Sequence, residues 1–250
     1  MTIRSIAAVP EAQEPWAPAF QWHVCDIGSR LPRGWVDQLL DIAARRGSTR
    51  DFRPTVSTAR EENPAEIPME AVDGDILAVE APWLSEMYAG AFLRLGGSLT
   101  RERVHPSPDP RIALSLNVLR GAVRYPCHVD SNPLQGLLYL TDCTADSGGE
   151  LAVARNPCAR NTDEVDADCV LVRPQAGQLF FFDARRNPHY VRPLRSPDTV
   201  RAVVTMNYYS DSCPESTRPQ GLDEALFAAR PARLAGGGGR HGRMSGAVGA

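Results

Sequence analysis

The sequence contains no lysine, and all 27 basic residues are arginine. Codon bias in a GC-rich genome is enough to explain this composition, but the chemical consequence holds whatever the cause. A Schiff-base lysine, a phosphate-loop lysine and a lysine general base are all excluded. Any anion that the protein binds must therefore be bound by arginine, whose planar guanidinium suits carboxylates.

Other common signals are also missing from this chain. The six cysteines form no CxxC pair, so their spacing favours neither a zinc site nor a disulfide framework. No apolar run is long enough to span a membrane, and the N-terminus lacks the apolar region of a secretory signal. The formal net charge of −3 gives no reason to expect nucleic acid or an anionic membrane as a partner. We therefore expect a cytoplasmic protein with reduced thiols.

The composition and apolar pattern of the 250-residue chain change along its length and divide it into five segments. Residues 1–19 are rich in Pro, Ala and Glu and predict a flexible N-terminal arm, and the Gly-rich residues 235–250 predict a disordered tail. Between them we expect an α/β support region over residues 20–110, a catalytic core over 111–215 and a C-terminal helix within 216–234. The support region could also close over the core as a lid.

Within the support region the pattern of apolar residues predicts a few elements. A short strand is expected at 20–27. Residues 34–47 and 82–97 carry apolar side chains at helical spacing, and glycines follow both runs. Residues 54–75 are rich in Pro and Glu, which indicates a long connection and the segment best placed to form a lid.

From residue 111 onward the chain consists of short apolar segments with alternating or β-branched residues. Pro, Gly, Asn and Asp separate them, namely RIALSLNVLR, LLYLT, GELAV, DCVLV, QLFFFD and TVRAVVTMNYY. Several short strands without helices between them are typical of a β-sandwich or barrel. The fold class predicted is mainly β with flanking helices.

The run YPCHVDSN places His128 two residues before Asp130. In a strand these two side chains would project from the same face, and an imidazole beside a carboxylate makes two-thirds of a metal site. The third ligand would have to come from another histidine, and His189 is favoured because it follows the strand-like run QLFFFD and a turn. Two histidines and one carboxylate form the facial triad of non-haem Fe(II) oxygenases. Taken alone, HxD is a weak signal, and hydrogen-bonded histidines are the ordinary alternative.

Five segments of the core occur in a characteristic order: YPCHVDSN, LLYLTD, GGELAV, PQAGQLFFFDARRNPHYVRPL and RAVVTMNYYSD. Over residues 111–211 the chain resembles the Fe(II)/2-oxoglutarate dioxygenase superfamily, and most of all its prolyl-4-hydroxylase-like branch. The resemblance implies a double-stranded β-helix, also called a jelly roll or cupin-like fold. It also implies that Fe(II) is held by His128, Asp130 and His189, which are then the catalytic metal ligands.

The same resemblance implies a binding site for the cosubstrate 2-oxoglutarate. Arg201 opens the strand after the second histidine, where the family places a basic residue that binds the distal carboxylate. Arg195 is the alternative residue for this role, but Arg195 is expected in a turn and not on a strand. Tyr139 matches a family tyrosine that helps to hold this carboxylate, with an ordinary core aromatic as the alternative. A further family tyrosine has no clear match, although Tyr125 is expected to line the substrate mouth.

The reaction implied is hydroxylation of an unactivated C–H bond with O2, giving succinate and CO2 as coproducts, with ascorbate as an additional reductant. Halogenating relatives replace the carboxylate ligand, so Asp130 favours hydroxylation or desaturation over chlorination. The substrate expected is a small molecule such as an amino acid or a natural-product intermediate. Its acidic group could be bound by arginines near the barrel mouth, namely Arg120, Arg124, Arg185, Arg186 and Arg192. The alternatives are a prolyl hydroxylase acting on a peptide or protein, and a cupin-like binding protein or zinc hydrolase.

Overall fold

The computed structural model describes residues 22–55, 57–219 and 222. The predicted arm (1–19) and Gly-rich tail (235–250) lie outside these residues, as does most of the predicted C-terminal helix (216–234). The strands are β1 (Trp22–Asp26), β2 (Ser48–Phe52), β3 (Ile67–Asp73), β4 (Val104–Pro106), β5 (Leu114–Arg120), β6 (Leu134–Tyr139), β7 (Leu151–Ala154), β8 (Cys169–Val172), β9 (Gln178–Phe182), β10 (His189–Val191) and β11 (Val200–Ser210). The helices are η2 (Gly28–Arg30), α1 (Trp35–Arg46), α2 (Gly74–Glu80), α3 (Pro82–Met87), η3 (Tyr88–Phe92), α4 (Leu93–Ser98), α5 (Pro110–Ala113), α6 (Thr162–Ala167) and η4 (Glu215–Thr217).

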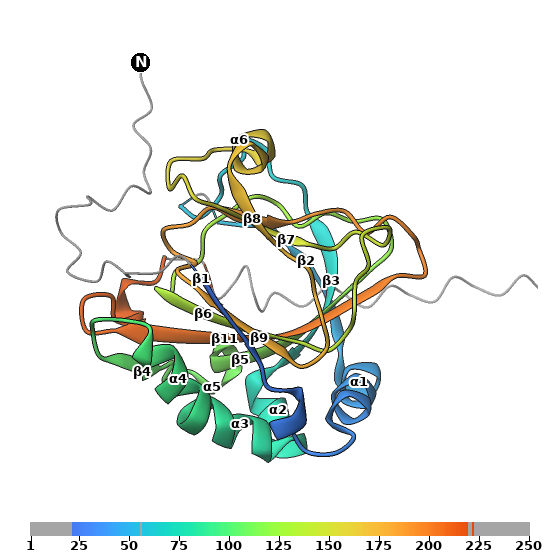
Figure 1. Ribbon diagram of the computed structural model, residues 1–250, viewed down its shortest axis with the longest axis vertical. Coiled ribbons are helices and arrows are strands. Elements are labelled where there is room, and N and C mark those ends of the chain that lie inside the picture. Colours follow the sequence, from blue (N-terminus) through green and yellow to red (C-terminus); the bar gives the residue numbers. More distant parts are fainter. Residues whose placement is uncertain (1–21, 56, 220–221, 223–250) are drawn as a thin grey trace, which may run out of the picture.

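Two antiparallel sheets lie face to face (Figure 1). The larger has eight strands in the order β1-β9-β6-β11-β5-β3-β2, with β4 paired to β11, and the smaller has the order β10-β7-β8. Helices α1 to α4 cover the outer face of the large sheet (Figure 1). This arrangement confirms the predicted double-stranded β-helix with flanking helices.

Side-chain alternation along β11 gives the large sheet two different faces. Ala202, Val204 and Met206 point to the helices and belong to the larger apolar core. The alternate residues Arg201 and Val203 point the other way and line a cavity between the two sheets. The period of two in the sequence therefore separates a helix-packing face from a cavity-lining face.

The region predicted as one helix, residues 82–97, is helical throughout but contains the π-helical turn η3 in its middle. Tyr88 lies in this turn, where its hydroxyl donates to the Asn207 carbonyl at 2.6 Å and accepts from the Ser107 amide at 2.8 Å. These two bonds fix the helical layer to β11 and to the chain before α5.

None of the helices within the described ranges is long and apolar enough to cross a membrane.

The prediction of a long connection over residues 54–75 was wrong in its second half. Strand β3 occupies Ile67–Asp73 and pairs with both β2 and β5, and α2 begins at Gly74. Ile67, Met69 and Ala71 alternate and are buried. Pro68 and Glu70 between them hid the strand, although Val72 on the same side as Glu70 is buried in the larger core.

Gly148, in the turn before β7, tests how closely this turn packs against the chain after β10. Its φ is +72°, and a β-carbon there would lie 2.0 Å from the Pro193 carbonyl oxygen. Gly121 has a similar φ of +75°, but a β-carbon there would meet nothing within 4 Å. We expect Gly121→Ala to lose about 1–2 kcal/mol of unfolding free energy, the cost of left-handed backbone alone. Gly148→Ala should lose clearly more in the same denaturant titration, and equal losses would contradict the packing described.

Candidate metal centre

The segment that carries His128 and Asp130 is not a regular strand, contrary to the prediction. His128 forms only isolated bridges, with Ala59 on one side and His189 on the other. The His128 amide donates to the His189 carbonyl at 3.0 Å, and the His189 amide donates to the His128 carbonyl at 2.9 Å. This reciprocal pair joins the segment to β10, which is why the two imidazoles lie close together.

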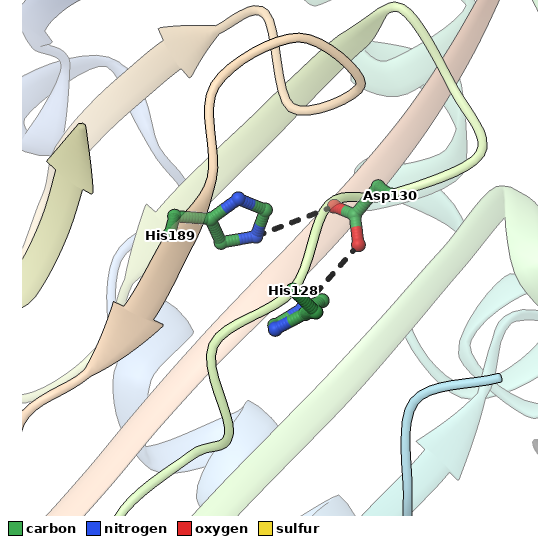
Figure 2. Close-up of side chains that lie close together, drawn as sticks. All are labelled: His128, Asp130 and His189. Atoms are coloured by element: carbon green, nitrogen blue, oxygen red, sulfur yellow. Dashed lines mark ion pairs between the residues drawn. The ribbon is translucent and has the colours of Figure 1, made fainter. Parts of the chain in front are cut away.

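The side chains of His128, Asp130 and His189 converge on one point (Figure 2). His128 Nε2 lies 3.5 Å from Asp130 Oδ1, and His189 Nε2 lies 3.8 Å from Asp130 Oδ2. The three candidate ligand atoms are all within 4.8 Å of one another, close enough to bind one ion. The two histidines are buried, while the side chain of Asp130 is 25% exposed. The sequence predicted these three ligands from spacing and from resemblance, and the structure brings them together in space.

Hydrogen bonds orient both imidazoles for metal binding. His128 Nδ1 lies 2.7 Å from the Pro126 carbonyl oxygen, and His189 Nδ1 lies 3.0 Å from the Asn187 carbonyl oxygen. A carbonyl only accepts, so each Nδ1 must carry the proton and donate it. Each Nε2 then presents a lone pair toward Asp130, which is the tautomer that a metal ligand requires.

Charge states at neutral pH suit the same role. Burial lowers the pKa of His189 to about 4, and the neighbouring His128 acts in the same direction. Burial alone would raise the pKa of Asp130, but its position beside the two imidazoles lowers this pKa overall. A neutral imidazole at His189 and an ionised carboxylate at Asp130 are the forms that bind a divalent cation.

Aromatic side chains enclose the metal-facing end of the cavity. The rings of Phe182 and His189 pack edge-on with centroids 4.9 Å apart, and those of Phe52 and His128 lie 5.7 Å apart. Tyr125 packs on Phe52 and lines the same cavity, in agreement with its expected position. Such walls limit the access of water to the centre.

Arg201 lies on the cavity face of β11 and is 4% exposed. Its Nε donates to the Gly149 carbonyl at 3.0 Å, and its guanidinium carbon lies 5.5 Å from the ring centre of Tyr139. Within the part of the chain that the structure describes, no carboxylate forms an ion pair with Arg201. A buried cation without an acidic partner is costly and indicates an anion-binding position.

The hydroxyl of Tyr139 is a second indication that an anion binds beside Arg201. The side chain is fully buried, and its oxygen makes no hydrogen bond within the described residues. Burial raises the pKa of Tyr139 to about 12, so the group is a neutral donor. A carboxylate beside Arg201 would satisfy this orphaned donor. Arg195, the rival, is exposed in a turn and donates to the Ala145 carbonyl instead.

The arginines expected to bind an acidic substrate do not reach the cavity. Arg120 pairs with Glu70, and Arg192 pairs with Asp166. Arg124 pairs with Glu61. Neither these three nor Arg185 and Arg186 belong to the residues that line the cavity.

Sequence reasoning missed a contact that supports the metal-binding segment. Glu61 accepts from Arg124 Nη1 at 2.6 Å and Nη2 at 2.8 Å, and from the amide of Cys127 at 2.6 Å. It thereby holds the backbone next to His128. Glu61 lies in the Pro/Glu-rich stretch, where nothing in the sequence distinguishes it from its acidic neighbours.

Residues 114–209 match the family model of the 2OG-Fe(II) oxygenase superfamily. This segment, which carries His128, Asp130, His189 and Arg201, belongs to that superfamily. Its members are enzymes with Fe(II) and 2-oxoglutarate as cofactors, and this chain is one of those enzymes. The search of curated proteins found no match.

Solved structures share the fold of this oxygenase. A prolyl hydroxylase from Trichoplax adhaerens, in complex with a fragment of hypoxia-inducible factor, is 20% identical over 80% of this chain and 86% of its own, with a TM-score of 0.55. AviO1 from Streptomyces viridochromogenes is 16% identical over 78% of this chain and 91% of its own, also with a TM-score of 0.55. The epimerase SnoN from nogalamycin biosynthesis is 16% identical over 76% and 78%, with a TM-score of 0.54.

The Glu61–Arg124 pair can be tested by substitution. Glu61→Gln removes a charge-assisted bidentate contact and should lower the free energy of unfolding by about 1.5–3 kcal/mol. The matched control is Glu70→Gln, because Arg120 is half exposed and lies 3.4 Å away. We expect this control to change stability by less than about 1 kcal/mol.

The effect of Glu61 should also depend on pH. Arg124 lowers the pKa of Glu61, so its contribution is complete above the unfolded-state value of about 4.3 and is lost as the pH falls through the lower folded-state value. Denaturant titrations of the wild type and of Glu61→Gln between pH 7 and pH 3 should therefore converge at the acidic end. A constant difference over this range would show that the ion pair is not its source.

Proposed function

We propose that the protein is an Fe(II)/2-oxoglutarate-dependent dioxygenase that hydroxylates an unactivated C–H bond of a small molecule, in the cytoplasm. One observation carries the proposal: two imidazole lone pairs and one carboxylate converge in the same cavity as a buried arginine that has no acidic partner among the described residues. The first group suits a divalent metal, and the second suits a dicarboxylate.

His128, Asp130 and His189 would hold the iron. When bound, Fe(II) with 2-oxoglutarate and O2 supplies the oxidising chemistry and releases succinate and CO2. The protein contributes orientation: the carbonyl oxygens of Pro126 and Asn187 keep both histidines in the metal-binding tautomer. Asp130 supplies a carboxylate at the position that halogenating relatives leave without one, which favours hydroxylation over chlorination.

Arg201 and Tyr139 would bind the far carboxylate of 2-oxoglutarate. The guanidinium supplies charge and two parallel donors, and the tyrosine hydroxyl supplies a neutral donor. Leu137, Leu151 and Val203 line the same part of the cavity and would cover the methylene groups of the cosubstrate. The fit rests on this buried cation and on the unsatisfied Tyr139 hydroxyl beside it.

The segment between β2 and β3 is a reason to propose a small molecule as the substrate. Thr58 and Arg60 of this segment lie against the metal-binding segment: the Arg60 amide donates to the Cys127 carbonyl, and the Val129 amide donates to the Thr58 carbonyl, both at 2.9 Å. This stretch forms a wall of the centre. A wall fixed by backbone bonds favours an enclosed ligand over an extended peptide.

Metal binding by the triad can be tested without turnover. We expect wild-type protein to bind one Mn²⁺, a redox-stable substitute for Fe(II), in anaerobic calorimetry. His128→Ala should abolish this binding, since one of three ligands is lost. His105→Ala, at an exposed histidine paired with Asp211, should leave it unchanged. Undiminished binding by His128→Ala would remove the triad from the proposal.

Cosubstrate binding can be tested by 2-oxoglutarate turnover with Fe(II) and a panel of small molecules and prolyl peptides. Arg201→Ala should raise the KM for 2-oxoglutarate by about 10- to 150-fold, the equivalent of a lost charge-assisted pair. Tyr139→Phe should raise it by about 2- to 12-fold. Arg195→Ala is the matched control and should change it less than about twofold.

The same panel separates the competing functions. Succinate release stimulated by small molecules supports the proposal, and release stimulated by prolyl peptides alone would instead indicate a prolyl hydroxylase. Zinc-dependent activity without 2-oxoglutarate, or metal binding with no turnover of any kind, would overturn the oxygenase assignment in favour of a hydrolase or a binding protein.

A further inference from the structure

A group of neutral polar side chains covers one part of the cavity wall. We call it the polar patch, and it consists of Ser115, Asn117, Asn132, Gln135, Thr205 and Asn207. Across the paired strands Thr205 lies opposite Ser115, and Asn207 lies opposite Gln135, so their side chains share one face. The cavity-facing row of β11 thus changes from Arg201 at one end to Thr205 and Asn207 further along.

The end of the polar patch that carries Asn132, Gln135 and Asn207 lies next to the chain of Asp130, whereas Asn117, opposite Val203, lies toward Arg201. Asn132 is two residues beyond Asp130, whereas Asn207 is six residues beyond Arg201 on β11, about 20 Å along an extended strand. A molecule held on the patch would therefore lie on the metal side of the cavity and leave the arginine for the cosubstrate.

The hydrogen bonds within the patch leave donors and acceptors unused. Asn132 Nδ2 donates to Gln135 Oε1 at 2.8 Å and to the Leu134 carbonyl at 2.9 Å. Within the described residues, the Gln135 amide nitrogen and the Asn132 side-chain oxygen make no hydrogen bond. Both residues are less than 5% exposed, at 4% and 3%. Both side chains line the cavity, so an unused donor lies beside an unused acceptor where a ligand can reach them.

Most of the charged side chains around the patch have partners of opposite sign. Arg50 forms a bidentate pair with Asp73, with both N–O distances 2.7 Å. Of the other cavity-lining arginines on this side, Arg111 pairs with Asp109 at 2.7 Å and Arg218 pairs with Glu215 at 3.2 Å. Arg53 lines the cavity as an exposed side chain. Apart from Arg53, a charged ligand group on the patch would thus meet neutral amides and compensated ion pairs.

From these observations we infer that the substrate is a neutral, polyhydroxylated small molecule, such as a sugar or a glycosylated compound. A hydroxyl group donates and accepts at once, which matches the adjacent Gln135 donor and Asn132 acceptor. A carboxylate could use only the donors, and an ammonium group only the acceptors. The inference rests on the proposed function, because it assigns the substrate of the same centre.

The test compares matched substrates with the Fe(II)-loaded enzyme and 2-oxoglutarate. The panel contains neutral glycosides and, for each, the uronic acid and the amino sugar with the same ring, together with a prolyl peptide. We expect the neutral glycosides to stimulate succinate formation with the lowest KM. Stimulation confined to the acidic, amino or peptide substrates would overturn the inference while leaving the oxygenase function in place.

Substitutions in the polar patch test whether it causes the expected preference for neutral substrates. Gln135→Met should raise the KM for the best neutral substrate by about 3- to 10-fold and leave the KM for 2-oxoglutarate unchanged. The same substitution at the exposed Gln175 is the matched control and should alter neither value. Thr205→Val, which keeps the shape of the side chain, is a second variant in case Gln135→Met does not fold. Unchanged substrate KM in folded variants at both positions would contradict a role for the patch.

The two proposals fail in distinguishable ways. If the oxygenase function is wrong, 2-oxoglutarate is not consumed with any substrate, nor in the slow turnover without substrate. If only the substrate class is wrong, that slow turnover persists and responds to Arg201→Ala, but neutral glycosides do not stimulate it.

Discussion

Two backbone hydrogen bonds between His128 and His189 hold the candidate metal centre together. They join an irregular segment to a three-residue strand of the small sheet, and neither partner has an extended ladder of its own. Because each residue donates to the other, the imidazoles start from adjacent backbone positions, with ring centroids 4.4 Å apart. The remaining features of the centre, including the carbonyl contacts at Nδ1 and the approach of Asp130, depend on this pairing.

The second constraint is the alternation of the large sheet. On β5, β6 and β11 every other residue packs against the helices, so the remaining positions face the cavity. The helix-facing residues are almost all apolar and stabilise the fold, since each buried aliphatic side chain contributes about 1.5–3 kcal/mol. The cavity-facing positions therefore carry the arginine, the tyrosine and the polar patch without disturbing the main core.

Much of the centre was predictable because its signals are local. HxD spacing, a histidine after an apolar strand and an arginine that opens the next strand are all visible in order along the chain. The alternation of Arg201 with Ala202 also indicated a strand with two different faces. Strand β3 was missed because proline and glutamate interrupt its apolar residues, and the irregular backbone at His128 was missed because HxD fits a strand equally well.

The sequence by itself determined the fold class, the candidate metal ligands and the absence of any lysine chemistry. Only the tertiary structure decided that Glu61 holds the backbone beside His128, that Arg201 is buried without an acidic partner in the described chain, and that Asn132 lies against Gln135 in a neutral wall. Residue type and spacing are properties of short segments. Burial and partnership arise when strands far apart in the chain pair, and no local pattern encodes which charges they leave uncompensated.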